Sequence, residues 1–269
     1  MLGTSKRRMR YYSDNFLLVL PQNIAIDNQD TFAYVPILDV LKAWLSHSDV
    51  LNAVLSDYRL HPRQNSMLCD MFDATAANEC QGFKDLNCLQ LLLYFDDFEV
   101  GNPIGSKRGK YKLFAVYFTI LNIPIKYRSK LENMHLVLLA TSKHIVTHGL
   151  DVIFAPVLKD IQKLMSSGID VSVDGIQHHF TGRLAFVCAD NLAANKVAGF
   201  TQNFSQGRVC RFCVATRGEI CNLHLESMCK LRTHQMHESH LKATYTGRQV
   251  SLLSVWSDKC LSLLVFKRL

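Results

Sequence analysis

The chain has 269 residues, 48% of them hydrophobic, which is enough apolar material for a substantial core and excludes an intrinsically disordered protein. The net charge of +7 and the sequence pI near 8.9 are compatible with a polyanionic partner. No window reaches the roughly 18 uninterrupted apolar residues of a membrane span, because serines and charged residues interrupt the apolar run 252–266. We therefore do not expect a membrane protein.

The cysteines and the N-terminal residues bear on the compartment. The cysteine count is nine, an odd number, and the spacing is not that of a secreted disulfide framework. The basic start, residues 6–10, precedes only five apolar residues, 16–20, which are too few for the apolar segment of a signal peptide. We expect a protein of a reducing compartment, the cytosol or the nucleus.

Residues 1–85 are expected to form a separate, mostly helical lead-in. Between residues 35 and 55, leucines and valines recur at mostly helical spacing. The stretch 70–81 is small and polar, which is typical of a connection into a following domain.

A buried strand that ends in two carboxylates begins the second domain. Residues 89–95 are apolar except for Gln90, as in a strand covered on both faces, and Asp96 and Asp97 follow at once. Carboxylates at the end of a central strand are well placed to bind a metal ion. The alternative is that the two aspartates only open the polar turn at 101–103.

The next elements follow in a recognisable order. A strand rich in aromatic and β-branched residues is expected at 111–121, and a further strand is expected at 134–140. An amphipathic helix is expected at 149–165. The dipeptide at 174–175, Asp-Gly, predicts a tight hairpin. A further strand at 180–190 ends on an aspartate.

Three strands, a helix and a fourth strand, with acids after the first and fourth strands, is the element order of an RNase H-like domain. We therefore expect an α/β fold with an RNase H-like core, a mixed sheet with flanking helices. In that fold the first and fourth strands are neighbours, so Asp96 or Asp97 would converge with Asp190 and bridge two Mg²⁺ or Mn²⁺ ions about 3.5–4 Å apart. The alternative for Asp190 is a cap or turn residue before a helix at 191–197, for which Asn191 is also a candidate cap.

Basic residues are concentrated between 106 and 130, where seven Lys or Arg occur without any acidic residue. Such a stretch suits the phosphate backbone of DNA, and the alternative is an ordinary solvated surface. The candidate DNA-binding residues are Lys107, Arg108, Lys110, Lys126 and Arg128.

Cysteine and histidine are dense between 210 and 240, which holds four of each. Cys210-Arg-Phe-Cys213 is a knuckle whose turn lets both thiolates face one metal ion, and a histidine pair with two intervening residues follows later. The favoured ligands of a structural Zn²⁺ ion are Cys210, Cys213, His237 and His240. Cys221 and His224 are an alternative to the histidine pair, and ordinary thiols without metal are the other alternative.

Parts of this sequence resemble the En/Spm (CACTA) class of DNA transposases, especially the animal transposon-encoded versions. The resemblance extends from about residue 86 to residue 213, which is about half of the chain. It rests on an ordered set of segments: 96–105, Asn122–Arg128, the passage through Phe180, Ala189–Asn191 leading to Gly199-Phe200, and Cys210-x-x-Cys213.

The resemblance implies a catalytic core with three acids, Mg²⁺-dependent cleavage and transfer of strands at transposon ends, and a zinc-binding insertion after the second acid. The first acid maps to Asp97, which we prefer, or to Asp96, and the second maps to Asp190. The zinc insertion maps to the cysteine and histidine pairs named above. The third acid belongs beyond the histidine pair, but Glu238 lies inside that pair and Asp258 lies in a tail that does not align with the family.

We therefore expect a C-terminally truncated chain of four parts: a lead-in at 1–85, an RNase H-like core at 86–205, a zinc-binding segment at 206–245 and a truncated tail at 246–269. The expected function is that of a nuclear, transposase-derived DNA-binding protein with a partial catalytic core. Two other functions stay open, an active Mg²⁺-dependent nuclease or strand transferase and a non-catalytic, zinc-stabilised interaction module. Association of the chain into a homo-oligomer is a further open alternative.

Overall fold

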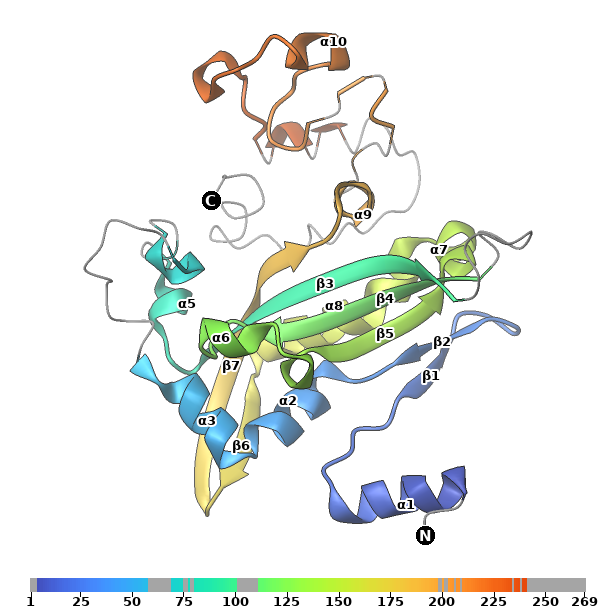
Figure 1. Ribbon diagram of the computed structural model, residues 1–269, viewed down its shortest axis with the longest axis vertical. Coiled ribbons are helices and arrows are strands. Elements are labelled where there is room, and N and C mark those ends of the chain that lie inside the picture. The colour runs from blue at the N-terminus through green and yellow to red at the C-terminus, as the bar shows by residue number, and fades with distance from the viewer. Residues whose placement is uncertain are drawn as a thin grey trace.

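The computed structural model describes residues 4–57, 69–74, 77, 80–100, 111–197, 200, 203–205, 207–208, 210–233, 235–237 and 239–240. Its centre is one curled, mixed sheet with helices packed on it (Figure 1). The expected α/β class, a mixed sheet with flanking helices, is confirmed. None of the described helices is long and apolar enough to cross a membrane.

Seven strands among the described residues form the sheet, in the order β1-β2-β5-β4-β3-β7-β6. They are β1 (Gln22–Ala25), β2 (Thr31–Tyr34), β3 (Cys88–Glu99), β4 (Lys112–Ile120), β5 (His135–Thr141), β6 (Ile169–Val173) and β7 (Ile176–Cys188). β3, β4 and β5 are antiparallel neighbours, whereas β3 and β7 run parallel. The parallel pair therefore lies inside the sheet, with β4 on one side and β6 on the other.

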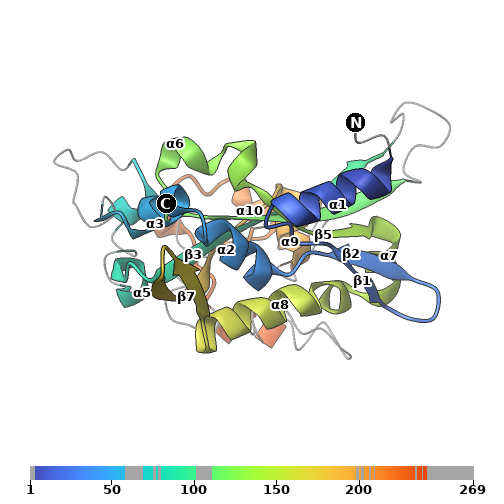
Figure 2. The ribbon, with the colours of Figure 1, turned by 90° about the horizontal axis from the view of Figure 1, so that it is seen from below.

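The helices surround this sheet. Those described are α1 (Ser5–Asn15), α2 (Ile37–Leu45), α3 (Ser48–Leu55), α5 (Gln81–Lys84), α6 (Ile125–Arg128), α7 (Ser142–His148), α8 (Leu150–Ser166), α9 (Asn191–Val197) and α10 (Arg217–Ile220), with 3-10 turns at Met71–Asp73, Leu131–Asn133 and Glu226–Met228. α8 runs along one face of the sheet and packs on β7, and α2 packs against α8 and β6 (Figure 2).

The main core lies between α8 and the face of the sheet that carries every second residue of β3. Leu91, Leu93 and Phe95 are fully buried on this face, because side chains alternate along a strand. The ring of Phe154 on α8 lies 6.1 Å from that of Phe95 and 5.8 Å from that of Phe114 on β4. Burial of each such side chain contributes roughly 1.5–3 kcal/mol to the free energy of folding. The face of β3 that carries these three side chains therefore points toward the core.

The N-terminal elements share this core. Leu41 and Leu45 of α2 are fully buried in the same cluster as the apolar residues of β3. The hydroxyl of Tyr34 on β2 donates a hydrogen bond to Oδ2 of Asp160 on α8 at 2.7 Å. This bond ties the β1–β2 hairpin to the helix, so the hairpin both extends the sheet and is fastened to its helical layer.

The predicted strands and the predicted helix at 149–165 are confirmed, with ends displaced by a few residues. Asp174 and Gly175 both have positive φ, 51° and 80°, as a tight two-residue hairpin requires. The strand predicted at 180–190 begins earlier, at Ile176, because the hairpin pairs its first residues with β6. The β1–β2 hairpin was not predicted, since each of its strands has four residues and few of them are buried.

Gly182 on β7 marks a close approach between the sheet and α8. A Cβ atom at this position would lie 2.7 Å from Cδ2 of Leu164 and 3.0 Å from the carbonyl oxygen of Leu89. Leu164 is fully buried and the Leu89 carbonyl belongs to the backbone of β3, so neither neighbour can move without disturbing the core. Glycine therefore lets β3, β7 and α8 meet at this point.

We expect Gly182→Ala to lower the free energy of unfolding by about 1–3 kcal/mol, the usual cost of overpacking a core. Gly218→Ala is the matched control, because a Cβ atom there would meet nothing within 4 Å, and alanine is a better helix former than glycine. Urea unfolding followed by circular dichroism measures both variants. Equal loss of stability in the two variants would contradict the close approach at Gly182.

Candidate functional site

Asp96 and Asp97 lie near the end of β3 and, as neighbours on a strand, point to opposite faces of the sheet. On the face away from α8, Oδ2 of Asp96 accepts a hydrogen bond from the hydroxyl of Tyr94 at 3.2 Å. On the other face, Oδ1 of Asp97 accepts a hydrogen bond from Oγ of Ser142, the first residue of α7, at 2.7 Å. Oδ2 of Asp97 lies 4.0 Å from Nζ of Lys196 on α9. The two adjacent carboxylates thus have separate surroundings.

Asp190 follows β7, the strand parallel to β3. Tyr94 lies opposite Cys188 in that pair, so two further residues along each chain lead to Asp96 and to Asp190. Oδ1 of Asp190 accepts a hydrogen bond from the backbone N–H of Ala193 at 2.7 Å, which makes Asp190 the N-cap of α9. Of the two candidate caps, Asp190 is therefore confirmed and Asn191, the first residue of α9, is not.

The phenol of Tyr94 links Asp96 to Asp190. Burial raises the pKa of Tyr94 above its ordinary value, and the charge and hydrogen bond of Asp96 and the charge of Asp190 raise it further. The charges of both carboxylates therefore act on one hydroxyl group. Carboxylate oxygens are the ligands that hard divalent cations prefer.

The described part of the chain supplies two carboxylates here. Within it, no third Asp, Glu, His or Cys joins Asp96 and Asp190 in a group whose ligand atoms all lie within 4.8 Å of one another. Glu238 and Asp258, the residues considered for the third acid, lie outside the described residues. The search for the third acid that the resemblance implies therefore extends beyond the described residues.

The predicted DNA-binding residues divide into two groups. Lys107, Arg108 and Lys110 lie outside the described residues, whereas Lys126 and Arg128 belong to α6. The guanidinium of Arg128 donates two hydrogen bonds to the carboxylate of Asp70, at 2.7 and 2.8 Å, and a third to the carbonyl oxygen of Ile123. The side chains of Arg128 and Asp70 are only 13% and 5% exposed. Arg128 therefore ties the 3-10 turn that follows Asp70 to the sheet.

Lys126 has a different environment. It is exposed, and its Nζ lies 4.8 Å from the ring centroid of Tyr127, while Nζ of Lys130 lies 5.0 Å from the same centroid. Two cations beside one aromatic ring form a small platform, a combination that nucleic-acid-binding surfaces use for phosphates and bases.

Cys210 and Cys213 form a compact turn. The backbone N–H of Phe212 donates to Sγ of Cys210 at 3.3 Å, and the backbone N–H of Ala215 donates to Cys213. Burial raises the pKa of the Cys213 thiol, and the nearby sulfurs of Cys210 and Cys229 raise it further. The structure therefore gathers three cysteines, two of them predicted ligands, into one neighbourhood.

The two predicted histidine ligands have other neighbours. Nε2 of His240 lies 3.0 Å from Arg208, and Nδ1 lies 3.0 Å from Arg232. Desolvation and these two positive charges lower the pKa of His240. His237 is buried with its ring 4.3 Å from that of Phe200. Among the residues that the structure covers, the predicted zinc ligands do not form a group of three within 4.8 Å.

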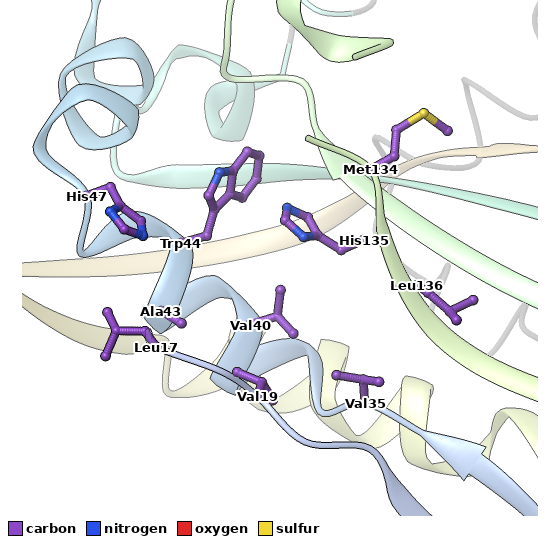
Figure 3. A pocket seen from close by; sticks show the side chains of 10 residues that line it. All are labelled: Leu17, Val19, Val35, Val40, Ala43, Trp44, His47, Met134, His135 and Leu136. Carbon is purple, nitrogen blue, oxygen red and sulfur yellow. The ribbon is translucent and has the colours of Figure 1, made fainter. Parts of the chain in front are cut away.

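A pocket of about 410 Å³ lies at the opposite end of the sheet from the aspartates, beside the start of β5. Figure 3 shows its lining, which comes from the segment after α1, from α2 and from β5: Leu17, Val19, Val35, Val40, Ala43, Trp44, His47, Met134, His135 and Leu136. The ring of His135 lies 4.4 Å from that of Trp44. Burial lowers the pKa of His135 from 6.5 to about 4, so the pocket has a mainly apolar lining with a neutral imidazole.

Sequence reasoning missed one group of side chains. Asp27 and Asp30, in the turn between β1 and β2, have carboxylate oxygens within 4.8 Å of each other and of a ring nitrogen of His148 on α7, and this is the one such group of three in the described residues. The available signal was the spacing of His144 and His148, because residues four apart share one face of a helix.

His135 should make the protein less stable as the pH falls. Because its folded pKa is about 4 and its ordinary value is 6.5, the unfolded chain binds a proton first. Stability should therefore be lost between pH 6.5 and pH 4, by about 2–3 kcal/mol. Urea unfolding of the wild type and of His135→Gln at pH 7 and pH 4.5 measures this loss. The variant should lose correspondingly less, and identical losses would contradict a neutral, buried His135.

No family model matches the sequence, and no curated protein is significantly similar to it. The resemblance to CACTA transposases therefore stays a prediction, and the inference of function depends on the geometry of the carboxylates, the basic surface and the cysteines.

Proposed function

We propose that this chain is a transposase-derived DNA-binding protein with a partial RNase H-like core of the En/Spm (CACTA) type. The observation that carries the proposal is the parallel pairing of β3 with β7, which leads Asp96 and Asp190 to the same phenol. The order β5-β4-β3-β7, with the first three strands antiparallel and the last pair parallel, is also the arrangement expected for the first four strands of such a core.

Asp96 and Asp190 are the proposed ligands of Mg²⁺ or Mn²⁺. Neighbouring strands lie about 4.8 Å apart, so carboxylates that continue one register can reach a common ion. A bound divalent ion supplies charge that polarises a phosphodiester. Tyr94 orients Asp96 through its hydrogen bond. Because Asp97 points to the opposite face and accepts a hydrogen bond from Ser142, the geometry favours Asp96 over Asp97 as the partner of Asp190.

DNA is the proposed partner, and a nuclear location follows from that partner. The exposed Lys126 and Lys130 beside Tyr127 support a phosphate contact at α6. Lys107, Arg108 and Lys110 belong to the same proposed surface. Arg128 contributes indirectly, because its ion pair with Asp70 holds the end of α6.

Zn²⁺ at Cys210 and Cys213 is the second metal of the proposal. Backbone N–H groups that donate to sulfur favour the thiolate, which is the form that binds zinc. The hydrogen bonds to Cys210 and Cys213 therefore support the cysteine half of the ligand set, while burial acts in the opposite direction on the Cys213 thiol. The neighbouring Cys229 adds a third sulfur that competes with the histidines for the remaining positions.

Mn²⁺ binding without DNA cleavage is the result that we expect. Asp96→Asn and Asp190→Asn should each weaken Mn²⁺ binding at least tenfold, while Asp97→Asn should change it much less. Supercoiled DNA should be nicked no faster than background in Mg²⁺ or Mn²⁺, because two carboxylates leave a second ion and an attacking water poorly held.

Isothermal titration and a gel assay of nicking measure these two outcomes. Asp170→Asn is the control, since Asp170 is an exposed acid on β6 whose side chain is 79% accessible. Nicking that Asp190→Asn abolishes and Asp170→Asn preserves would indicate a working nuclease. Mn²⁺ binding that is equal in all variants would remove the metal part of the proposal.

DNA binding should weaken steeply with salt. Each phosphate contact contributes about −0.9 to the slope of log K against log salt concentration, so replacing four contacts should flatten the slope by up to about 3.6. The test variant replaces Lys107, Arg108, Lys110 and Lys126 with alanine. The control variant replaces four basic residues of α1, Lys6, Arg7, Arg8 and Arg10.

Filter binding over a salt series compares the two variants. The net charge falls equally in both, so a larger change in the first variant reports contacts rather than total charge. If only the α1 substitutions alter the slope, α1 rather than the proposed surface binds DNA. If neither variant alters the slope, neither surface binds DNA.

A further inference from the structure

Two aspartates and two histidines meet where the β1–β2 turn contacts α7, far along the chain from one another. Nε2 of His148 lies 3.0 Å from Oδ2 of Asp30 and 3.7 Å from Oδ2 of Asp27. Nε2 of His144 lies 3.4 Å from Oδ1 of Asp30. The two imidazole side chains are only 13% and 18% exposed, so the group is partly shielded from solvent.

The fold builds both halves of this group locally. Oδ1 of Asp27 accepts hydrogen bonds from the backbone N–H groups of Gln29 and Asp30, at 2.8 and 2.7 Å, which closes the turn and leaves Oδ2 directed at His148. On α7, the four-residue spacing brings the two histidines onto one face of the helix.

The distances within the group match those of a zinc site. Zinc binds histidine nitrogen and carboxylate oxygen at about 2.0–2.2 Å, and tetrahedral geometry then separates neighbouring ligand atoms by roughly 3.3–3.5 Å. Within the group of Asp27, Asp30 and His148, the two nitrogen-to-oxygen distances are 3.0 and 3.7 Å, on either side of that separation. Mixed imidazole and carboxylate ligands favour a transition-metal ion of this kind over Mg²⁺ or Ca²⁺, which prefer oxygen alone.

We propose that Asp27, Asp30 and His148 bind one divalent transition-metal ion, with Zn²⁺ as the best fit and with His144 beside Asp30 as a neighbour of the site. The ion joins the β1–β2 hairpin, at one edge of the sheet, to α7. The first residue of α7 is Ser142, which donates a hydrogen bond to Asp97. A metal ion at this position thus fixes α7, the helix that hydrogen-bonds to Asp97. The proposed metal site does not depend on the proposed DNA-binding function.

Simple ion pairs between aspartate and protonated histidine are the competing explanation, and the chain contains a natural control. Nδ1 of His179 lies 2.7 Å from Oδ1 of Asp170, an exposed pair between β6 and β7 with the same two residue types. That pair belongs to no group of three ligands among the described residues. A metal effect should therefore be confined to the β1–β2 turn and α7.

The experiment measures Zn²⁺ bound to the full chain by equilibrium dialysis after treatment with a chelator. His148→Asn and Asp30→Asn should each remove about one zinc per chain or weaken its binding at least about tenfold, and His179→Asn and Asp170→Asn should leave zinc unchanged. Asp27→Asn should weaken binding while keeping the turn, because the amide oxygen still accepts both backbone hydrogen bonds.

Zinc at the cysteines is distinguished by cobalt. Co²⁺ bound to thiolate absorbs in the near ultraviolet, whereas Co²⁺ bound only to imidazole and carboxylate does not. The thiolate absorption should be the same in all five variants, and far-ultraviolet circular dichroism should show that each is folded. Equal zinc content and affinity in the wild type, Asp27→Asn and His148→Asn would overturn the proposal and leave the group as ion pairs only.

Discussion

The parallel pairing of β3 with β7 is the constraint on which the rest of the structure depends. It joins two segments separated by the whole of β4, β5, α8 and β6, and α8 covers it on one face. Gly182 permits this layer to close, because the backbone of β3 and a buried leucine of α8 occupy the space that a Cβ atom would need. Without the pairing, Asp190 would cap a helix with no acid beside it. With the pairing, it lies two residues beyond the partner of Tyr94, as Asp96 lies two residues beyond Tyr94 itself.

Much of the central sheet was predictable because its strands are long, apolar and separated by turns with clear chemistry. Residues 89–95 are fully buried on one face of the sheet, and on the other Leu92 and Tyr94 are half-buried, while Asp174-Gly175 supplies the two positive φ angles of the hairpin. The β1–β2 hairpin could not be predicted in this way, since its short strands take their place from contacts with β5 and α8. The local hydrophobic pattern of the sequence thus predicted the long apolar strands at the centre of the sheet, and not the short strands that depend on distant contacts.

The candidate site was predictable only in part, for a related reason. The sequence places acids after two strands, but the pleat of β3 decides that Asp96 and Asp97 face different ways. Arg128 belongs to a basic run in sequence, yet its guanidinium is taken by Asp70, which lies 58 residues earlier. His240 has metal-ligand spacing but lies between two arginines. Partners distant in the chain decide what each of these side chains can do.

The two outermost strands of the sheet have a consequence for self-association. β1 has four residues, as many as its neighbour β2, and β6 has five, whereas its neighbour β7 has 13. A long, flat edge offers unpaired backbone groups to another chain, and short edge strands limit that template. The hairpin at one border and β6 at the other thus protect the apolar central strands from edge-to-edge aggregation. Copies of this protein that associate are expected to do so through helices or loops rather than by continuing the sheet.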